Sequence, residues 1–268
     1  MQQVKEFLKM TFKEVGQKQC EKCGHVYKLY ETPKGVLGAC KPCADRELIE
    51  KYNLPTAEEY RRSKEMNFIL SFERVTDDLK NVTVNSYQPK NESQLKAKQL
   101  AIKFVKEFDG SKSLTFAGTP GLGKSHLAYA ISKALRAKGK KTLFIKVTDF
   151  FDRIKSTYNS HPNVTEEQIF KMIEDFDLLV LDDIGSEYVK GDEYGHESWA
   201  SDVLYKVFDL RLNKSTICTT NYSESELIQK YGNNGPRIIS RMMNNANGIR
   251  LEGDDYRRIR AKGQYRLV

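Results

Sequence analysis

From Glu92 onward, apolar positions along the chain alternate between two spacings. Segments 92–108 and 124–139 place apolar residues three and four apart, the spacing of a helix with one buried face. Short, nearly continuous apolar runs, typical of strands buried on both faces, occur at 112–118, 142–147, 178–182, 215–221 and 248–253. Further helices are predicted at 148–158, 165–176 and 197–213, with two short ones between 223 and 243. This alternation predicts an α/β domain over 92–268, with a parallel sheet flanked by helices and ligands at the carboxyl ends of its strands.

The first 66 residues follow a different pattern. They have a short amphipathic start, a cysteine-bearing loop and a polar helix from Glu47 to Met66. So short a segment forms a thin core, which a bound metal can stabilise. We therefore predict a zinc-binding domain at 1–66 and interpret the mixed sequence at 67–91 as a linker.

Four of the five cysteines form two close pairs with the spacing C-x2-C-x16-C-x2-C. Each pair allows two thiolates to reach one ion from a tight turn, and the loop between the pairs brings the second one round. In a chain without a secretion signal, this spacing favours structural zinc over disulfides. The alternatives are a redox pair or an iron–sulfur cluster. The predicted ligands are Cys20, Cys23, Cys40 and Cys43.

Composition places the chain among globular proteins, since 39% of its residues are hydrophobic and 30% are charged. No apolar run approaches the ~18 residues of a membrane span, and the charged N-terminus does not resemble a signal peptide. We therefore expect a cytoplasmic protein without a membrane partner. Its net charge of +8 is concentrated at the ends, with eight basic and three acidic residues in 237–268. A basic tail favours a polyanionic partner, but a solvated charged face explains it equally well.

The clearest motif is GTPGLGKS at 118–125, which lies between a predicted strand and a predicted helix. Its glycines allow backbone N–H groups to face phosphate oxygens, its lysine brings a cation to the outer phosphates, and its serine offers a hydroxyl to Mg²⁺. The sequence therefore predicts a P-loop that binds a nucleotide. The predicted contacts are Gly118, Thr119, Pro120, Gly121, Leu122, Gly123, Lys124, Ser125 and His126.

Two adjacent aspartates end the apolar run FDLLVLDD. P-loop enzymes carry a Mg²⁺ carboxylate on such a strand, so Asp182 is expected to hold Mg²⁺ together with Ser125, and Asp183 to polarise the attacking water. Asn221 follows the next core strand, where an amide could orient that water or sense the γ-phosphate. Taken alone, Asn221 is explained better as a turn residue or helix N-cap.

The chain resembles the AAA+ ATPases of the DnaC/DnaI type, which are bacterial and phage replicative helicase loaders. Five motifs carry this resemblance: GTPGLGKSHLA, DLLVLDDIGSE, TTNYS, RIISRM and DDYRRIR. The resemblance covers about 92–260, and the cysteine-rich module before it is similar to the DnaI branch, in which that module binds the helicase. The resemblance implies that Asn221 is the sensor-1 residue and that Arg257 is the sensor-2 residue, which reads the nucleotide in cis. It also implies that Arg241 reaches the γ-phosphate of a neighbouring subunit, with Arg237 as a supporting candidate.

The chain departs from the family pattern at two places. AAA+ relatives often have Asp-Glu where this chain has Asp182 and Asp183, and the shorter second carboxylate implies slow hydrolysis. Only 15 residues follow Gly253, fewer than the helical lid of many AAA+ proteins requires. We therefore expect an AAA+ fold that lacks a full C-terminal lid, as loader proteins do.

The helices predicted at 148–176 stand where related ATPases line a single-strand DNA channel. Tyr158 could stack on a base beside a phosphate contact from Lys155, although packing between the helices explains Tyr158 equally well. Lys190 is a further candidate for phosphate contact, with little support.

The leading interpretation is an ATP-dependent loader that uses ATP, Mg²⁺ and Zn²⁺. It would bind a replicative helicase through its zinc module, bind single-stranded DNA through its ATPase domain, and assemble with copies of itself. The alternatives are an IstB-like transposition helper ATPase, a P-loop kinase for a small molecule, and a zinc-dependent nucleic-acid binder with a vestigial nucleotide site.

Overall fold

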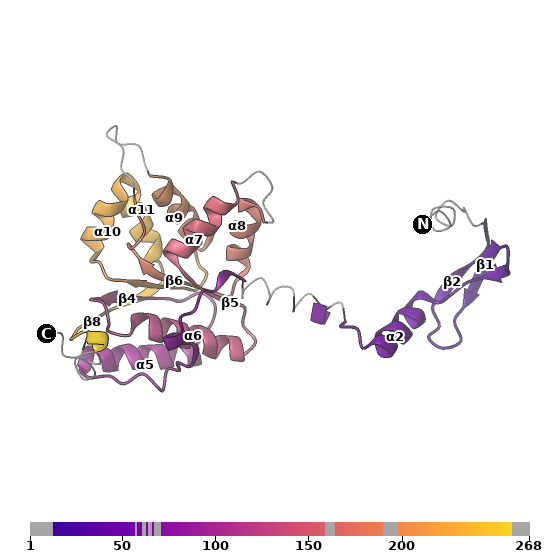
Figure 1. The fold of residues 1–268 in the computed structure, drawn as a ribbon, viewed down its shortest axis with the longest axis horizontal. Coiled ribbons are helices and arrows are strands. Elements are labelled where there is room, and N and C mark those ends of the chain that lie inside the picture. The colour runs from indigo at the N-terminus through magenta and orange to yellow at the C-terminus, as the bar shows by residue number, and fades with distance from the viewer. Residues whose placement is uncertain are drawn as a thin grey trace. The chain divides into compact units, whose positions relative to one another are not determined.

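The computed structural model describes residues 13–56, 58–60, 63, 66, 71–158, 164–189 and 198–258. It forms two compact units, Met1–Asn67 (unit 1) and Phe68–Val268 (unit 2) (Figure 1). No helix within the described ranges has both the length and the apolar character that crossing a bilayer requires.

Unit 1 contains a small antiparallel sheet that the sequence pattern did not reveal. Its strands are β1 (Lys13–Gln19), β2 (Val26–Thr32) and β3 (Gly35–Leu37), in that spatial order. Helix α2 (Lys41–Tyr52) follows. It begins earlier than the helix that the sequence predicted at 47–66 and ends earlier, at Tyr52; the described residues 58–60, 63 and 66 are helical again. The helix stops because Asn53 adopts a left-handed conformation (φ 49°) and Pro55 disfavours helical backbone at the residue before it.

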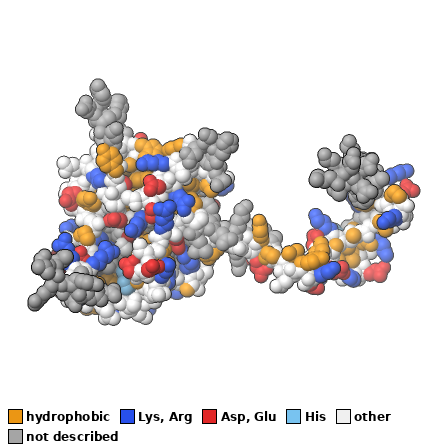
Figure 2. Space-filling view, viewed as in Figure 1, with side chains coloured by type: hydrophobic (Ala, Val, Ile, Leu, Met, Phe, Trp, Pro, Cys, Tyr) orange, Lys and Arg blue, Asp and Glu red, His pale blue; other side chains and the backbone are white. Residues whose placement is uncertain are grey.

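Apolar side chains on unit 1 remain largely at its surface (Figure 2). Among the described residues of this unit, Cys40 alone counts as a buried hydrophobic residue. Five side chains are 49% to 60% exposed: Val26, Val36, Leu37, Leu48 and Tyr52. A core this small gives little hydrophobic stabilisation, so the unit needs another source of stability.

Unit 2 is built on a five-stranded parallel sheet in the order β5-β6-β7-β4-β8. The strands are β4 (Ser113–Gly118), β5 (Thr142–Lys146), β6 (Leu178–Ile184), β7 (Thr216–Thr220) and β8 (Ala246–Leu251). Side chains of β6 alternate between two hydrophobic clusters, one on each face of the sheet. The predicted α/β fold with a parallel sheet is confirmed.

Helices cover both faces of this sheet (Figure 1). One face carries α5 (Glu92–Lys106) and α6 (Lys124–Ala137). The other carries α7 (Val147–Ser156), α8 (Glu166–Asp175), α9 (Trp199–Leu210), α10 (Glu224–Tyr231) and α11 (Gly235–Met242), with the 3-10 turn η1 (Gly232–Asn234) before α11. Of the segment after Gly253, where a lid was expected to be missing, the structure describes only 254–258.

The segment predicted as a linker packs on unit 2 from Phe72 onward and includes the short helix α4 (Asp77–Lys80). It contributes Leu79, Val82 and Tyr87 to the cluster beneath α5 and α6. Near its start, Glu73 accepts a hydrogen bond from the Phe144 backbone N–H on the edge strand β5 (2.9 Å) and pairs with Arg136. This carboxylate therefore fastens the segment to the edge of the sheet.

A buried arginine joins α8 to the start of β7. Arg211 is only 3% exposed and donates to the carbonyl oxygens of Ile173 (3.1 Å), Phe176 (2.5 Å) and Ser215. Its burial lowers the pKa of Arg211 to about 10. The guanidinium thus supplies donors to carbonyls at the end of α8 that have no partner within the helix.

Candidate functional site

The loop between β4 and α6 approaches two other segments very closely. A Cβ atom on Gly123 would lie 2.5 Å from the Tyr87 ring, and one on Gly121 would lie 1.8 Å from the Asp255 carboxylate. Both glycines have positive φ, 80° and 79°, which side chains disfavour. The tight phosphate loop predicted at 118–125 is therefore packed between the linker segment and the segment after β8.

Lys124 sits at the start of α6 and is 6% exposed. Its ammonium donates to the carbonyl oxygens of Gly118 and Thr119 (both 2.7 Å) and to Asn221 Oδ1 (2.8 Å). Burial lowers the pKa of Lys124 to about 8, although Asp183 and Asp182 oppose the shift. The cation that the sequence predicts to bind phosphate is thus held at the carboxyl end of the sheet.

The acidic pair lies on a β-bulge. Leu181 pairs with Cys218 and Ile184 pairs with Thr220, so Asp182 and Asp183 together face Thr219. Asp183 adopts a left-handed backbone with φ 64°. Neighbouring side chains of a regular strand point to opposite faces, whereas the bulge re-aims one member of this pair.

Thr219 was missed by the sequence analysis, and it contacts both aspartates. Its hydroxyl donates to Asp182 Oδ1 (2.7 Å) and accepts the Asp183 backbone N–H (2.8 Å). Nothing in the sequence around Thr219 indicates this role. Its contact with the aspartates depends on the bulge in β6, a strand more than thirty residues earlier.

Asn221 connects the lysine to the second aspartate. Its Nδ2 donates to Asp183 Oδ1 (2.7 Å), while its Oδ1 accepts from Lys124. The structure thus brings three predicted site residues into one hydrogen-bonded chain at the end of β7. An amide fixed at both ends has a defined orientation, which suits the positioning of a water molecule or a phosphate oxygen.

Asp182 and Ser125 provide suitable Mg²⁺ ligands. Asp182 is 1% exposed. Burial raises the pKa of its carboxyl, while hydrogen bonds from Thr219 and Ser125 oppose that rise. Mg²⁺ prefers oxygen ligands, usually one or two carboxylates with water and phosphate. A serine hydroxyl bonded to a buried carboxylate at the phosphate loop therefore fits Mg²⁺ chemically.

The lowered pKa of Lys124 predicts a pH-dependent nucleotide affinity. Bound phosphates favour the ammonium form, so affinity for a fluorescent ATP analogue should fall by up to about tenfold per pH unit above about pH 8. Lys124→Arg, which keeps its charge, should bind with an affinity that changes little from about pH 7 to about pH 9.5. An equally flat profile for the native protein would contradict this expectation.

Two other predicted nucleotide contacts lie against the phosphate loop through different segments. The Tyr256 backbone N–H donates to Gly121 O (3.1 Å), and the positive charge of Arg257 contributes to the lowered pKa of Lys124. Arg257 therefore lies near the lysine. His126 instead bonds the carbonyl of Thr83 (3.0 Å) and packs edge-on against Tyr87, so its interactions are with the linker segment.

The two predicted finger arginines share one aromatic ring. Arg237 and Arg241 lie over Tyr205 of α9, at 5.6 and 4.4 Å from the ring centroid. Arg241 also pairs with Asp209 (2.7 Å), whereas Arg237 is exposed. Both arginines lie on α11, apart from the hydrogen-bonded chain of Lys124 and Asn221.

The DNA-binding candidates surround Trp199, the single tryptophan of the chain. Lys155 Nζ lies 5.2 Å from the centroid of the Trp199 ring system, and the indole N–H donates to the Tyr158 hydroxyl (3.1 Å). Tyr158 is 58% exposed. Trp199 was missed because it begins a helix whose pattern indicated packing only. Lys190 lies outside the described residues.

All four predicted cysteine ligands converge in unit 1. Their Sγ atoms lie within 4.8 Å of one another, with 3.7 Å between Cys20 and Cys43 and 3.4 Å between Cys23 and Cys40. Tetrahedral zinc with Zn–S bonds of ~2.3 Å separates its sulfurs by about 3.8 Å. Hydrogen bonds from the backbone of Cys23 and Lys22 lower the pKa of Cys20 to about 7, which favours a thiolate. The cluster therefore has the chemistry and spacing of a zinc site.

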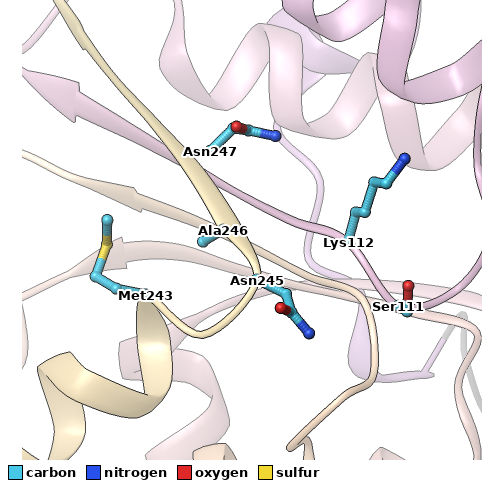
Figure 3. A pocket seen from close by; sticks show the side chains of 6 residues that line it. All are labelled: Ser111, Lys112, Met243, Asn245, Ala246 and Asn247. Carbon is cyan, nitrogen blue, oxygen red and sulfur yellow. The ribbon is translucent and has the colours of Figure 1, made fainter.

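A hollow occurs at the amino ends of the strands, at the opposite end of the sheet from Lys124 and Asn221 (Figure 3). It is lined by Ser111, Lys112, Met243, Asn245, Ala246 and Asn247, which lie at the beginnings of β4 and β8. Ligands of open parallel sheets bind at the carboxyl ends of strands, so this hollow is separate from the nucleotide site.

Comparisons with known proteins identify relatives of this chain. The family model described as "IstB-like ATP binding protein" matches residues 56–264. The replicative helicase loader DnaC of Escherichia coli (strain K12) is 31% identical over 66% of this chain and 69% of its own length. The replicative helicase loader DnaI of Bacillus subtilis (strain 168) is 25% identical over 96% of this chain and 89% of its own length.

Among solved structures, one titled "Crystal structure of the DnaC helicase loader" matches with a TM-score of 0.57 and 29% identity. The match covers 66% of this chain and all of the DnaC chain. The chain therefore belongs to the IstB-like ATP-binding protein family and is a relative of the replicative helicase loaders DnaC and DnaI.

Proposed function

We propose that this protein loads a replicative DNA helicase onto single-stranded DNA in a cycle controlled by ATP. The observation that carries the proposal is the hydrogen-bonded chain from Lys124 through Asn221 to Asp183, found in a relative of named helicase loaders. This chain joins Lys124, the proposed phosphate-binding cation, to Asp183, the proposed general base that activates water.

In the proposed cycle, the phosphate loop and Lys124 bind the triphosphate, and Ser125 and Asp182 hold Mg²⁺. When bound, Mg²⁺ neutralises charge on the phosphate oxygens. Asp183 accepts a proton from the attacking water, which Asn221 orients. Arg257 reads the nucleotide in cis. Hydrolysis is slow because Asp183 is one methylene shorter than glutamate.

Copies of the chain would assemble so that Arg241 or Arg237 reaches the nucleotide of a neighbour. The guanidinium of Arg241 must first leave Asp209, to which it is paired at 2.7 Å. Arg237 is more exposed than Arg241, and both guanidinium groups lie over Tyr205, so this ring could present either one. An arginine supplied in trans stabilises charge that develops on the transferred phosphoryl group.

Unit 1 would bind the helicase. Two observations support this role. Apolar side chains on β2, β3 and α2 are largely exposed, and a cysteine cluster suited to zinc joins α2 to the strands. The DnaI relative, whose name is that of a helicase loader, also aligns over nearly all of this chain. Exposed apolar surface on a small unit is typical of a protein-binding site.

Single-stranded DNA would bind where Tyr158, Lys155 and Trp199 meet. Two aromatic rings beside an ammonium group can stack on bases and contact the backbone, at ~1–3 kcal/mol per stacked base. Lys190 is a further candidate.

The test mixes the full-length protein with the replicative helicase of its host, with ATP or ADP, and sizes the complex by native mass spectrometry. A complex is expected that contains both proteins and one zinc per chain, and that is retained better with ATP. Cys43→Ser should abolish the complex, while His25→Ala, an exposed neighbour outside the cysteine cluster, should preserve it. No complex with the native protein would exclude the loader function.

An IstB-like transposition helper ATPase is the second candidate, because the matching family model is described as "IstB-like ATP binding protein". A protein that binds ATP and DNA but no helicase would favour it. Family membership gives no support to a small-molecule kinase.

A further inference from the structure

Thr219 makes two hydrogen bonds whose directions are fixed. The side chain is 1% exposed, so water does not supply alternative partners. The Thr219 oxygen accepts the Asp183 N–H, because an N–H can only donate. Its single hydrogen is donated to Asp182, whose Oδ1 lies 2.7 Å from Thr219 Oγ1. One hydroxyl thus binds the side chain of the first acid and the backbone of the second.

The β-bulge makes this hydroxyl necessary. Register between β6 and β7 breaks after Leu181 and resumes at Ile184, so the Asp183 N–H lacks the partner that a regular ladder gives. Thr219 supplies that partner and fixes the turn at Asp183, whose φ is 64°. The same turn directs the Asp183 carboxylate toward Asn221.

We propose that Thr219 is a positioning residue for the Mg²⁺–nucleotide site, which sets the orientation of the Asp182 carboxylate and the backbone turn of Asp183. With Oδ1 bonded to Thr219, the Asp182 carboxylate is held where it also accepts a hydrogen bond from Ser125, the other predicted Mg²⁺ ligand. Hydrogen-bonded carboxylates of this kind are pre-oriented ligands, and loss of the partner costs about 10–100-fold in metal affinity. The inference rests on the proposed nucleotide site and extends it to a residue that touches neither nucleotide nor metal.

The test uses Thr219→Val, which keeps the shape of the side chain and removes the hydroxyl. Binding of a fluorescent ATP analogue is titrated with Mg²⁺, and the Mg²⁺ concentration for half-maximal tightening is measured. We expect it to rise about tenfold or more in Thr219→Val. Thr219→Ser, which restores the hydroxyl, should return it to within about twofold of the native value. This readout does not depend on hydrolysis.

The matched control is Thr220→Val. Thr220 is equally buried on the same strand, but its hydroxyl bonds the carbonyl of Ile184 and the N–H of Tyr222. Its half-maximal Mg²⁺ concentration should stay within about twofold of the native value. If Thr219→Val does not fold, Thr219→Ala replaces it and must show the same shift.

An unchanged Mg²⁺ requirement in a folded Thr219→Val, an equal shift in Thr220→Val, or failure of serine to restore binding would each overturn the inference. Mg²⁺-independent binding by the native protein would also overturn it. Native protein that binds Mg²⁺ and nucleotide but captures no helicase would contradict the loader function alone.

Discussion

Replacing Asp183 with asparagine is expected to preserve nucleotide binding and to lower the rate of ATP hydrolysis by a factor of about 10²–10⁴, the usual contribution of a general base. Asparagine tolerates the left-handed backbone at this position, φ 64°, and its amide oxygen can still accept from Asn221. The substitution therefore removes the charge and the basicity while the geometry remains. Steady-state phosphate release and equilibrium binding of an ATP analogue measure the two effects separately.

Asp183→Glu is the informative companion variant. It restores the carboxylate that AAA+ relatives often carry, but glutamate is less suited to a left-handed backbone than aspartate. Its rate should exceed that of Asp183→Asn. Asp78→Asn, on the exposed surface of α4, should hydrolyse ATP at the native rate. Hydrolysis by Asp183→Asn within about threefold of the native rate would assign the base elsewhere.

Arg211→Met is expected to lower the free energy of unfolding of unit 2 by about 3–5 kcal/mol, because it leaves several buried carbonyls without a donor at about 1–3 kcal/mol each. The carbonyls of Ile173, Phe176 and Ser215 lose their partner together. Methionine fills much of the same volume, so the effect reports hydrogen bonding more than packing. Urea unfolding followed by the fluorescence of Trp199, the single tryptophan, measures unit 2 alone.

Lys214→Met is the matched control. Lys214 lies three residues away and donates to the Glu174 carbonyl (2.9 Å), but it is only partly buried, so water can reach it. Its loss should cost less than about 1 kcal/mol. If Arg211→Met also costs less than about 1 kcal/mol, water replaces the guanidinium and the site is not sealed.

Features whose cause is local could be predicted from the sequence. The phosphate loop needs glycines, a lysine and a serine at fixed spacing within eight residues, and here one apolar strand precedes it and a helical pattern follows it. The sequence places Lys124 just after the loop that follows one strand, and Asp182 and Asn221 at the ends of two others. Parallel strands then bring these ends to one edge of the sheet, where the structure has them.

Features that depend on register between distant strands could not be predicted. The bulge at Asp182 and Asp183 arises from pairing with β7, so neither the left-handed turn nor the role of Thr219 has a local signature. The sheet of unit 1 escaped detection for another reason. Strands β1 and β3 are mostly exposed on both faces, and β2 has apolar or aromatic residues on its exposed face as well as on its half-buried face. The sequence therefore lacks the apolar–polar alternation that burial of one face imposes.

The hydrogen bond from Phe144 of the edge strand β5 to the Glu73 carboxylate has a consequence for self-association. Free N–H groups on a sheet edge are templates onto which a second chain can add a strand, which leads to uncontrolled polymers. At Phe144 this donor is already satisfied by Glu73, which Arg136 holds in place. A strand from another copy could pair there only after breaking that ion pair, so this part of the β5 edge is protected against strand addition.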